Sequence, residues 1–190
     1  MTLVVGLNGS PRRNGNSATL LDQALRAAEA SGAQAVRLDL AFMDISPCKA
    51  CEDCFADGEC VIRDDMDRVY QLLEEADAVI VASPIYFSGM SSCAKLAVDR
   101  CQALWARRQV LKRPRKPGAG AIILTAAQPN AKFDNAVSEL RAFLIGIGIA
   151  PGETLKVAGA DGSSYAADHP EVLAQARELG TRLLSSLSGP

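Results

Sequence analysis

The feature that most constrains the fold of this chain is a regular alternation of short apolar runs with amphipathic helical patterns. Five runs have the length and composition of strands, at 3–7, 35–38, 79–82, 121–124 and 154–157. The first four are short and rich in β-branched residues, as expected of strands covered on both faces. Strands that alternate with helices pair in parallel, because each helix returns the chain to the same edge of the sheet.

Between these runs, apolar residues recur at the three- and four-residue spacing of helices with one buried face. The predicted buried faces carry Ala18, Leu21, Leu25 and Ala28; Met66, Val69, Leu73 and Ala76; Ala97, Cys101 and Leu104; Val137, Leu140, Leu144 and Ile147; and Val172, Leu179, Leu183 and Leu187. The pattern predicts one α/β domain over residues 1–190, a three-layer sandwich with a five-stranded parallel sheet between helices.

Composition and charge exclude several classes of protein. A length of 190 residues suits one domain with a substantial core, and 48% hydrophobic residues is too high for a disordered chain. The formal charge of −2 offers no basic excess to neutralise nucleic-acid phosphates. No apolar run is long enough to span a bilayer, and the first ten residues read as a strand and not as a signal peptide. We therefore expect a cytoplasmic protein with reduced thiols and with neither nucleic acid nor membrane as a partner.

Two connections are longer than the fold needs. Residues 40–64 lie between the second strand and the second helix, and residues 106–118 precede the fourth strand. The second connection carries six basic side chains from Arg107 to Lys116. A solvated connection is the favoured interpretation, and contact with the phosphates of a nicotinamide dinucleotide is the alternative.

The loop after the first strand, "GSPRRNGNS" at 9–17, has the composition of an anion site at a helix start. Ser10, Asn16 and Ser17 can donate hydrogen bonds, and Arg12 adds a fixed positive charge. The dinucleotide pattern G-x-G-x-x-G is absent, and Asn16 stands where a Walker loop needs Lys. The loop therefore suits a mononucleotide phosphate. A capped polar turn without a ligand is the alternative.

The third strand ends in "ASPIYFSGMSSCAK", at 82–95, beside the first loop in the usual strand order of such sheets. Pro84, Tyr86, Phe87 and Gly89 make a rigid, partly aromatic turn with close access to its backbone. A flat heteroaromatic ring could lie there, with backbone N–H groups reaching its nitrogen and oxygen atoms. In the alternative interpretation, the two aromatic rings only cover the end of the core.

Four of the six cysteines lie in an insertion at about 44–63, with the spacing C-x2-C-x2-C-x5-C. The spacing is close to that of a bacterial ferredoxin, with a longer final gap in which Gly58 can make a tight turn. Structural zinc usually uses two separated C-x-x-C pairs, which are missing here. Zinc and free thiols remain alternatives to a cluster, while Cys93 and Cys101 are predicted to be buried core residues.

Together these motifs resemble a known family. "GSPRRNGNS" and "SPIYFSGMSS" resemble the NADPH-dependent FMN reductase-like branch of the flavodoxin-like fold, and the cysteine loop is similar to that of its iron–sulfur flavoproteins. The resemblance runs from the first strand to about residue 130. It implies a flavodoxin-like sheet of order 2-1-3-4-5, with FMN and a [4Fe-4S] cluster as cofactors.

The resemblance also implies which residues bind these groups. The FMN phosphate would be held by Ser10, Arg12, Asn16, Ser17 and Ala18. The isoalloxazine would contact Pro84, Ile85, Tyr86, Phe87, Ser88 and Gly89. A third contact region should follow the fourth strand, in "TAAQPN", at Thr125 and Ala126. The cluster ligands would be Cys48, Cys51, Cys54 and Cys60.

The leading hypothesis is an FMN-dependent electron-transfer oxidoreductase that passes electrons between a [4Fe-4S] cluster and FMN. No side chain is needed as nucleophile or base, and the only histidine, His169, lies among residues typical of a helix start. A cluster-free NAD(P)H-dependent FMN or quinone reductase is the first alternative. A non-enzymatic thiol- or metal-responsive module is the second.

The expected partners are redox partners and further copies of the chain. The donor or acceptor could be NAD(P)H, a quinone or a ferredoxin. The resemblance implies homodimers or homotetramers in which a cluster serves a neighbour's flavin. We expect the 48–62 loop in the interface, because Phe55, Val61 and Ile62 would be exposed on a projecting loop.

Overall fold

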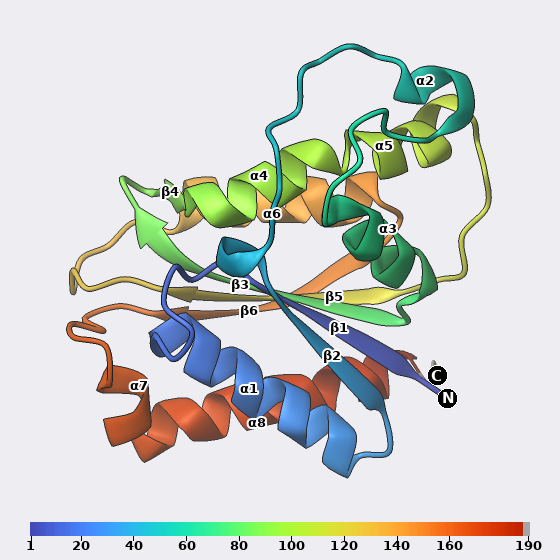
Figure 1. Ribbon diagram of the computed structural model, residues 1–190. Coiled ribbons are helices and arrows are strands. Elements are labelled where there is room, and N and C mark those ends of the chain that lie inside the picture. The colour runs from blue at the N-terminus through green and yellow to red at the C-terminus, as the bar shows by residue number, and fades with distance from the viewer. Residues whose placement is uncertain (188–190) are drawn as a thin grey trace.

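Five parallel strands form the centre of the computed structural model, which describes residues 1–187 (Figure 1). They are β1 (Leu3–Asn8), β2 (Gln34–Asp39), β3 (Ala78–Tyr86), β5 (Ala119–Thr125) and β6 (Ala150–Val157). Their order across the sheet is β2-β1-β3-β5-β6, which is the predicted order 2-1-3-4-5 when only the parallel strands are numbered. The predicted flavodoxin-like sandwich is therefore confirmed.

The helices cover both faces of the sheet (Figure 1). On one face lie α1 (Asn16–Ala30) and α8 (Pro170–Leu187), with the short α7 (Tyr165–Asp168) before α8. On the other lie α3 (Met66–Glu75), α4 (Ser92–Arg100) and α6 (Asp134–Gly146), with α5 (Gln102–Trp105) following α4. Within residues 1–187, no helix is both long and apolar enough to cross a membrane.

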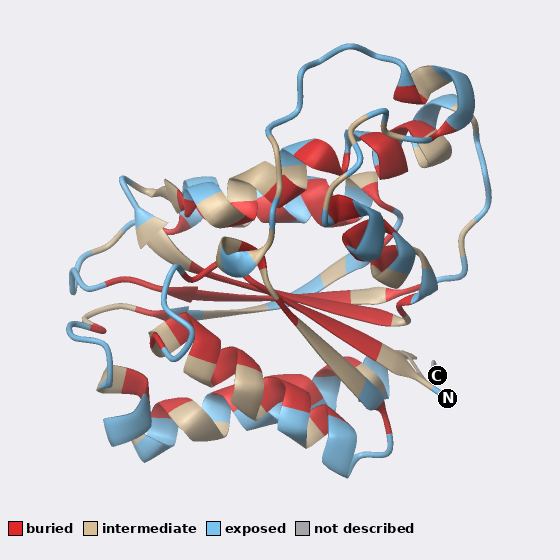
Figure 2. Ribbon diagram, viewed as in Figure 1, coloured by how far each residue is buried: buried red, intermediate tan, exposed pale blue. Residues whose placement is uncertain are grey.

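Each face of the sheet has its own apolar core, because successive side chains of a strand point to opposite faces. In β3, Val79 and Val81 pack toward α3, α4 and α6, while Ile80 packs toward α1 and α8. The central strands are buried along their length, whereas the edge strands β2 and β6 are partly exposed (Figure 2).

One short strand was not predicted. β4 (Gly89–Met90) pairs antiparallel with the end of β3, and Phe87 and Ser88 form the turn between them. Both turn residues have left-handed backbone conformations, with φ of 50° and 65°. Asn-Gly or Asp-Gly is the usual signal for a turn of this kind, and neither is present here.

The 40–64 connection starts with a 3₁₀ turn, η1 (Leu40–Phe42), and contains one helical turn, α2 (Cys54–Asp57). It leaves the carboxyl end of β2, crosses the outside of α4 and brings α2 against α5 (Figure 1). The cysteines thus lie toward the α5 end of α4, while β4 lies at the other end.

The basic connection is largely exposed, as the favoured sequence interpretation predicts, but several of its basic side chains are paired. It begins with a π-helical turn, η2 (Ala106–Val110), whose Arg107 pairs with Glu59 and Glu74. Arg115 donates to the carbonyls of Leu73 and Ala76. Arg107, Arg108, Arg115 and Lys116 thus hold an otherwise exposed connection to the protein.

Candidate functional site

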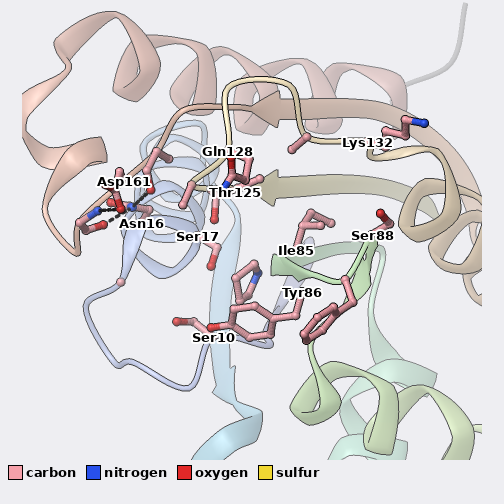
Figure 3. A pocket seen from close by; sticks show the side chains of 18 of the residues that line it. Ser10, Asn16, Ser17, Ile85, Tyr86, Ser88, Thr125, Gln128, Lys132 and Asp161 are labelled. Atoms are coloured by element: carbon pink, nitrogen blue, oxygen red, sulfur yellow. Dashed lines mark hydrogen bonds between the residues drawn. The ribbon is translucent and has the colours of Figure 1, made fainter.

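A cavity of about 660 Å³ opens at the carboxyl ends of β1, β3, β5 and β6 (Figure 3). This volume lies within the usual range for small-molecule and cofactor sites. Most of the residues predicted to bind FMN line it: Ser10, Arg12, Asn16, Ser17, Pro84, Ile85, Tyr86, Phe87, Ser88, Thr125 and Ala126. The other two, Ala18 and Gly89, are not among the lining residues. Segments far apart in sequence thus meet at one edge of the sheet, as expected for this type of sheet.

One end of the cavity is the start of α1. The N-cap residue, Gly15, provides no side-chain cap, and the first turn contains no acidic residue. The first helical hydrogen bond runs from the Thr19 N–H to the Gly15 carbonyl, at 2.9 Å. The N–H groups of Asn16, Ser17 and Ala18 therefore have no acceptor within the helix, and they lie at the positive end of its dipole. Such a helix start can bind an anion.

The loop before α1 places further donors beside this helix start. The Ser10 N–H donates to Asn8 Oδ1 at 3.1 Å, and Ser10 Oγ accepts from the Arg12 N–H at 3.1 Å. Its hydroxyl proton remains available to a ligand. The Arg12 side chain is exposed and lines the cavity. Ser10 and Arg12 can thus both meet an anion bound at α1.

Asn16 has a different role from the one predicted for its side chain. Its amide Nδ2 donates to the carbonyls of Ala160 and Gly162, at 3.1 and 2.8 Å, and its Oδ1 accepts from the Ala166 N–H at 3.0 Å. The amide therefore ties the segment after β6 to the first turn of α1 (Figure 3). Because the side-chain amide is already hydrogen-bonded, Asn16 can offer a ligand only its main-chain N–H.

Two contacts hold the first loop against α4. Ser91, the N-cap of α4, donates from its hydroxyl to the Gly9 carbonyl at 2.5 Å and accepts from the Ala94 N–H. A Cβ atom on Gly9 would lie 2.7 Å from the Ala94 Cβ, which is too close for two carbon atoms. Glycine at this position lets the loop lie directly on α4.

The other end of the cavity is the turn between β3 and β4. Its residues Phe87 and Ser88 adopt left-handed conformations that are unfavourable for side chains other than glycine. Backbone strain of this kind is found at ligand-binding sites, where the surrounding structure maintains it. Tyr86 is half exposed and Phe87 fully exposed, so the alternative in which both rings cover the core is wrong.

Several lining residues were missed by sequence reasoning: Gly15, Ala131, Lys132, Ala160, Asp161 and Gly162. Ala127, Gln128 and Asn130 lie in the predicted third contact region, "TAAQPN", but were not individually assigned. Lys132 lies at the ring end near Ser88, and Asp161 lies at the α1 end near Asn16 (Figure 3). Each of these positions except Gly15 follows a strand, β5 or β6. The rule that ligands bind beyond the carboxyl ends of the strands could have identified them.

All four cysteines of the insertion line a second cavity, of about 370 Å³, which shares no lining residue with the first. Cys54 is buried and Cys60 is partly buried, while Cys48 and Cys51 are exposed. Among the described residues, no three Cys, His, Asp or Glu side chains converge closely enough to hold a single metal ion. Thiolates on one zinc ion must lie close together, because each Zn–S bond is only about 2.3 Å long. Those at the corners of a cubane cluster lie further apart.

The backbone around these cysteines contains sharp turns. Gly58 ends α2 with φ of 78°, so the predicted tight turn before Cys60 is confirmed. A Cβ atom there would lie 2.5 Å from Arg107 Cγ. Ala50 and Glu52, on either side of Cys51, also have left-handed conformations. These turns direct the loop back on itself around the cavity.

The two cysteines outside the insertion, Cys93 and Cys101, differ in how far they are buried. Cys101 is buried in the core, and burial raises the pKa of its thiol to about 12, which keeps it protonated. The prediction of a core residue is confirmed for Cys101, while Cys93 is only partly buried. In the insertion, burial raises the pKa of Cys54, and the negative charges of Cys60, Cys48 and Cys51 raise it further.

Arg100, at the end of α4, also lines the cysteine cavity and was missed by sequence reasoning. Its side chain is fully buried and forms an ion pair with Asp64 at 2.6 Å. Burial opposes ionisation of Asp64, but hydrogen bonds from Arg100 and from the Ser46 and Met66 N–H groups outweigh it and hold its pKa below the usual range. The sequence could have identified Arg100 as a buried residue, because it lies within the apolar helical stripe of Ala97, Cys101 and Leu104.

Comparisons with known proteins agree with this geometry. The family described as NADPH-dependent FMN reductase matches residues 2–160. An iron–sulfur flavoprotein of Archaeoglobus fulgidus is 36% identical over 85% of this chain and 78% of its own length. One of Methanocaldococcus jannaschii is 31% identical over 75% of this chain and 71% of its own. The solved structure of an NAD(P)H:quinone oxidoreductase from Methanothermobacter marburgensis has a TM-score of 0.74 at 16% identity, over 96% of each chain.

Proposed function

The chain belongs to the family of iron–sulfur flavoproteins and NADPH-dependent FMN reductases and is an FMN-dependent oxidoreductase; from this premise we propose that it passes electrons between a [4Fe-4S] cluster and FMN. The observation that carries the proposal is the presence of two separate cavities. One combines a free helix start with a strained aromatic turn, and the other is lined by all four clustered cysteines. We treat residues 1–190 as one FMN-binding domain, with the cysteine insertion at about 44–63.

The first cavity fits FMN in charge and in shape. The phosphate would meet Ser10, Arg12, Ser17 and the main-chain N–H groups of Asn16 and Ala18. The ring would lie against the turn from Pro84 to Gly89, in the cavity that Thr125 and Ala126 also line. These groups bind and orient the flavin, since the redox chemistry belongs to the cofactor and not to a side chain.

The second cavity fits an iron–sulfur cluster better than zinc. One cavity is lined by all four cysteines of the insertion, Cys48, Cys51, Cys54 and Cys60, but their thiols do not converge on a single point. The ligands of a cubane cluster are also spread around a space, because each binds a different corner. Bound FMN would exchange one or two electrons and the cluster one at a time. The protein's part is to hold both groups at fixed positions and to set their potentials.

The separation of the two cavities supports transfer between subunits. Ser91 at one end of α4 contacts the flavin-side loop, and Arg100 at the other end lines the cysteine cavity. The nine residues of α4 span roughly 13 Å at 1.5 Å per residue. Cys48, Cys51 and Val61 are exposed, so a second copy of the chain could bring its flavin close to this cluster. We therefore propose homodimers or homotetramers with the 48–62 loop in the interface.

Two residues of that loop, Phe55 and Ile62, are only partly exposed and so are less available than expected. Phe55 packs at a tilt against Trp105 of its own chain, with ring centroids 5.9 Å apart. Val61, which is 57% exposed, is the better candidate for an interface contact. Light scattering on the protein and on a Val61→Asp variant tests the assembly, and an oligomer unchanged by the substitution would remove the loop from the interface.

The electron donor and acceptor remain part of the proposal. The family description supports NADPH or NADH as donor. A quinone or a ferredoxin is the proposed alternative partner. We propose a cytoplasmic location, where the thiols that bind the cluster would stay reduced.

Anaerobic purification followed by a visible spectrum and by iron, sulfide and FMN assays tests the function. We expect flavin bands on a broad cluster absorbance that dithionite bleaches. In a Cys54→Ala variant, iron should fall and FMN should remain, because no cysteine of the insertion lines the flavin cavity. Flavin bands alone in the wild type would favour a cluster-free reductase, and no chromophore would favour a thiol-responsive module.

A further inference from the structure

Arg100 occupies an unusual position for a charged residue. It belongs to the apolar face of α4, its side chain is fully buried, and it forms part of the wall of the cysteine cavity. Burying a guanidinium is unfavourable unless it is paired and hydrogen-bonded. The contacts that compensate this burial therefore indicate what the residue does.

Those contacts join both ends of the cysteine insertion to α4. Arg100 Nη1 donates to the Ser46 carbonyl at 2.8 Å, two residues before the first cysteine. Nη2 donates to the Ile62 carbonyl at 3.1 Å, two residues after the last. The Asp64 carboxylate accepts from both nitrogens. One planar guanidinium thus closes the loop that carries all four thiols.

The anchor itself is fixed from a third element. The Tyr70 hydroxyl, on α3, donates to the Arg100 carbonyl at 2.8 Å within the core. On the other side of the loop, Arg107 Nε donates to the Gly58 carbonyl at 2.9 Å, and Arg107 pairs with Glu59. The insertion is therefore held by side-chain contacts, since it has almost no regular secondary structure of its own.

One donor of Arg100 is left over. Its Nε is buried and has no hydrogen-bond partner among the described residues. Four thiolates around an iron–sulfur cluster make an anionic group, and hydrogen bonds and nearby charge tune the potential of such a group. Nε has almost no accessible surface and does not reach the cavity, but the positive charge of a guanidinium in the cavity wall suits an anionic cluster.

We propose that Arg100 is the positioning residue of the cluster site: it closes the cysteine loop through Ser46, Ile62 and Asp64, and its positive charge stabilises the reduced cluster. This inference rests on the proposed cluster function. It assigns two separable effects to one side chain. The hydrogen-bonding fork retains the cluster, and the charge raises its reduction potential.

Two substitutions separate these effects. Arg100→Lys keeps the charge and loses the planar fork, which a point charge cannot replace. Arg100→Gln removes both the positive charge and the fork, while the Asp64 carboxylate keeps its hydrogen bonds from the Ser46 and Met66 N–H groups. Arg108→Lys is the matched control, because Arg108 is also buried, pairs with Glu74 and has an unpartnered Nε, yet does not line the cavity.

The experiment uses anaerobically reconstituted protein and measures FMN content, the rate of iron release to a chelator and the cluster midpoint potential. Loss of a supporting residue beyond the direct ligands typically weakens a metal site 10- to 100-fold. We expect iron release at least about tenfold faster in both Arg100 variants, with wild-type FMN content. The midpoint potential should move to more negative values in Arg100→Gln and stay near wild type in Arg100→Lys. The Arg108→Lys control should match the wild type throughout.

Wild-type release rates and potentials in both Arg100 variants would overturn the inference. Loss of FMN together with iron in both variants would also overturn it, because Arg100 would then hold the fold and not the cluster. A wild-type protein that binds FMN but cannot be reconstituted with iron and sulfide would instead refute the proposed function. The outcomes for the two proposals are thus distinct.

Discussion

The flavin cavity and the cysteine cavity are held together by different means. Main-chain groups at the ends of parallel strands and a free helix start form much of the first, so most of its geometry follows from the sheet itself. The second lies on a long irregular insertion that buried arginines hold to α4 and η2. From this difference we expect the local fold of the flavin site to survive the substitution of single side chains. The local fold of the cysteine site should depend on them.

The largest expected effect is on the cysteine side. Asp64→Ala leaves the buried Arg100 charge without its partner, and we expect the free energy of unfolding to fall by about 3–5 kcal/mol. Urea unfolding of the FMN-free, cluster-free protein measures it. Asp67→Ala is the control, since its pair with Arg63 is exposed and should contribute less than about 1 kcal/mol. Equal losses in the two variants would show that the buried pair is not a special anchor.

On the flavin side, we expect Arg12→Ala to change binding and not folding. It removes a fixed charge from an exposed side chain in the cavity, worth about 1.5–3 kcal/mol toward a phosphate, or about ten- to a hundredfold in FMN affinity. Fluorescence titration at low salt, together with urea unfolding, separates the two effects. Arg13→Ala is the control, because Arg13 stacks on Phe42 and pairs with Asp39 outside the cavity. An unchanged FMN affinity in Arg12→Ala would exclude this residue from the site.

A smaller effect is expected where the two regions are linked through α4. Ser91→Ala removes the N-cap of α4 and the hydrogen bond to the Gly9 carbonyl, and it should lower the free energy of unfolding by about 0.5–2 kcal/mol. FMN affinity should fall with it, because the first loop loses a contact that holds it to α4. The neighbouring Ser92 is exposed, so Ser92→Ala should leave both quantities unchanged. The role of Ser91 as a link would be contradicted if the two variants behaved alike.

The smallest effect is a pH dependence specific to the cysteine side. The pKa of Asp64 is lower in the folded protein than its ordinary value of about 4, so its ionised form stabilises the fold above that value. This contribution is lost as the pH falls through the lower, folded-state pKa. The difference in unfolding free energy between the wild type and Asp64→Asn should stay constant from about pH 5 to 8 and shrink below about pH 4. A difference that persists in strong acid would mean that the carboxylate is not the stabilising form.

Local patterns in the sequence were sufficient for the framework. The apolar runs predicted the five parallel strands, and the helical stripes predicted the main helices, because both report the burial of one face at a fixed period. The motifs after the first and third strands identified two walls of the flavin cavity. The turn after the third strand was predicted, but Phe87 and Ser88 carry no Asn-Gly or Asp-Gly signal for a hairpin, so the short strand β4 was missed.

The sequence by itself determined the strands and the spacing of the four thiols, because these depend on residues close together in the chain. The order of the strands was expected from the resemblance of the loop motifs to a known family. Only the tertiary structure decided the use of particular side chains. Asn16 binds the carbonyls of Ala160 and Gly162, which are 144 and 146 positions away, and Arg100 reaches back to Ser46 across 54 positions. Such pairings arise when packed helices and loops bring distant polar groups together and leave them no water to bond. No local period encodes them, so they become visible only when the fold is known.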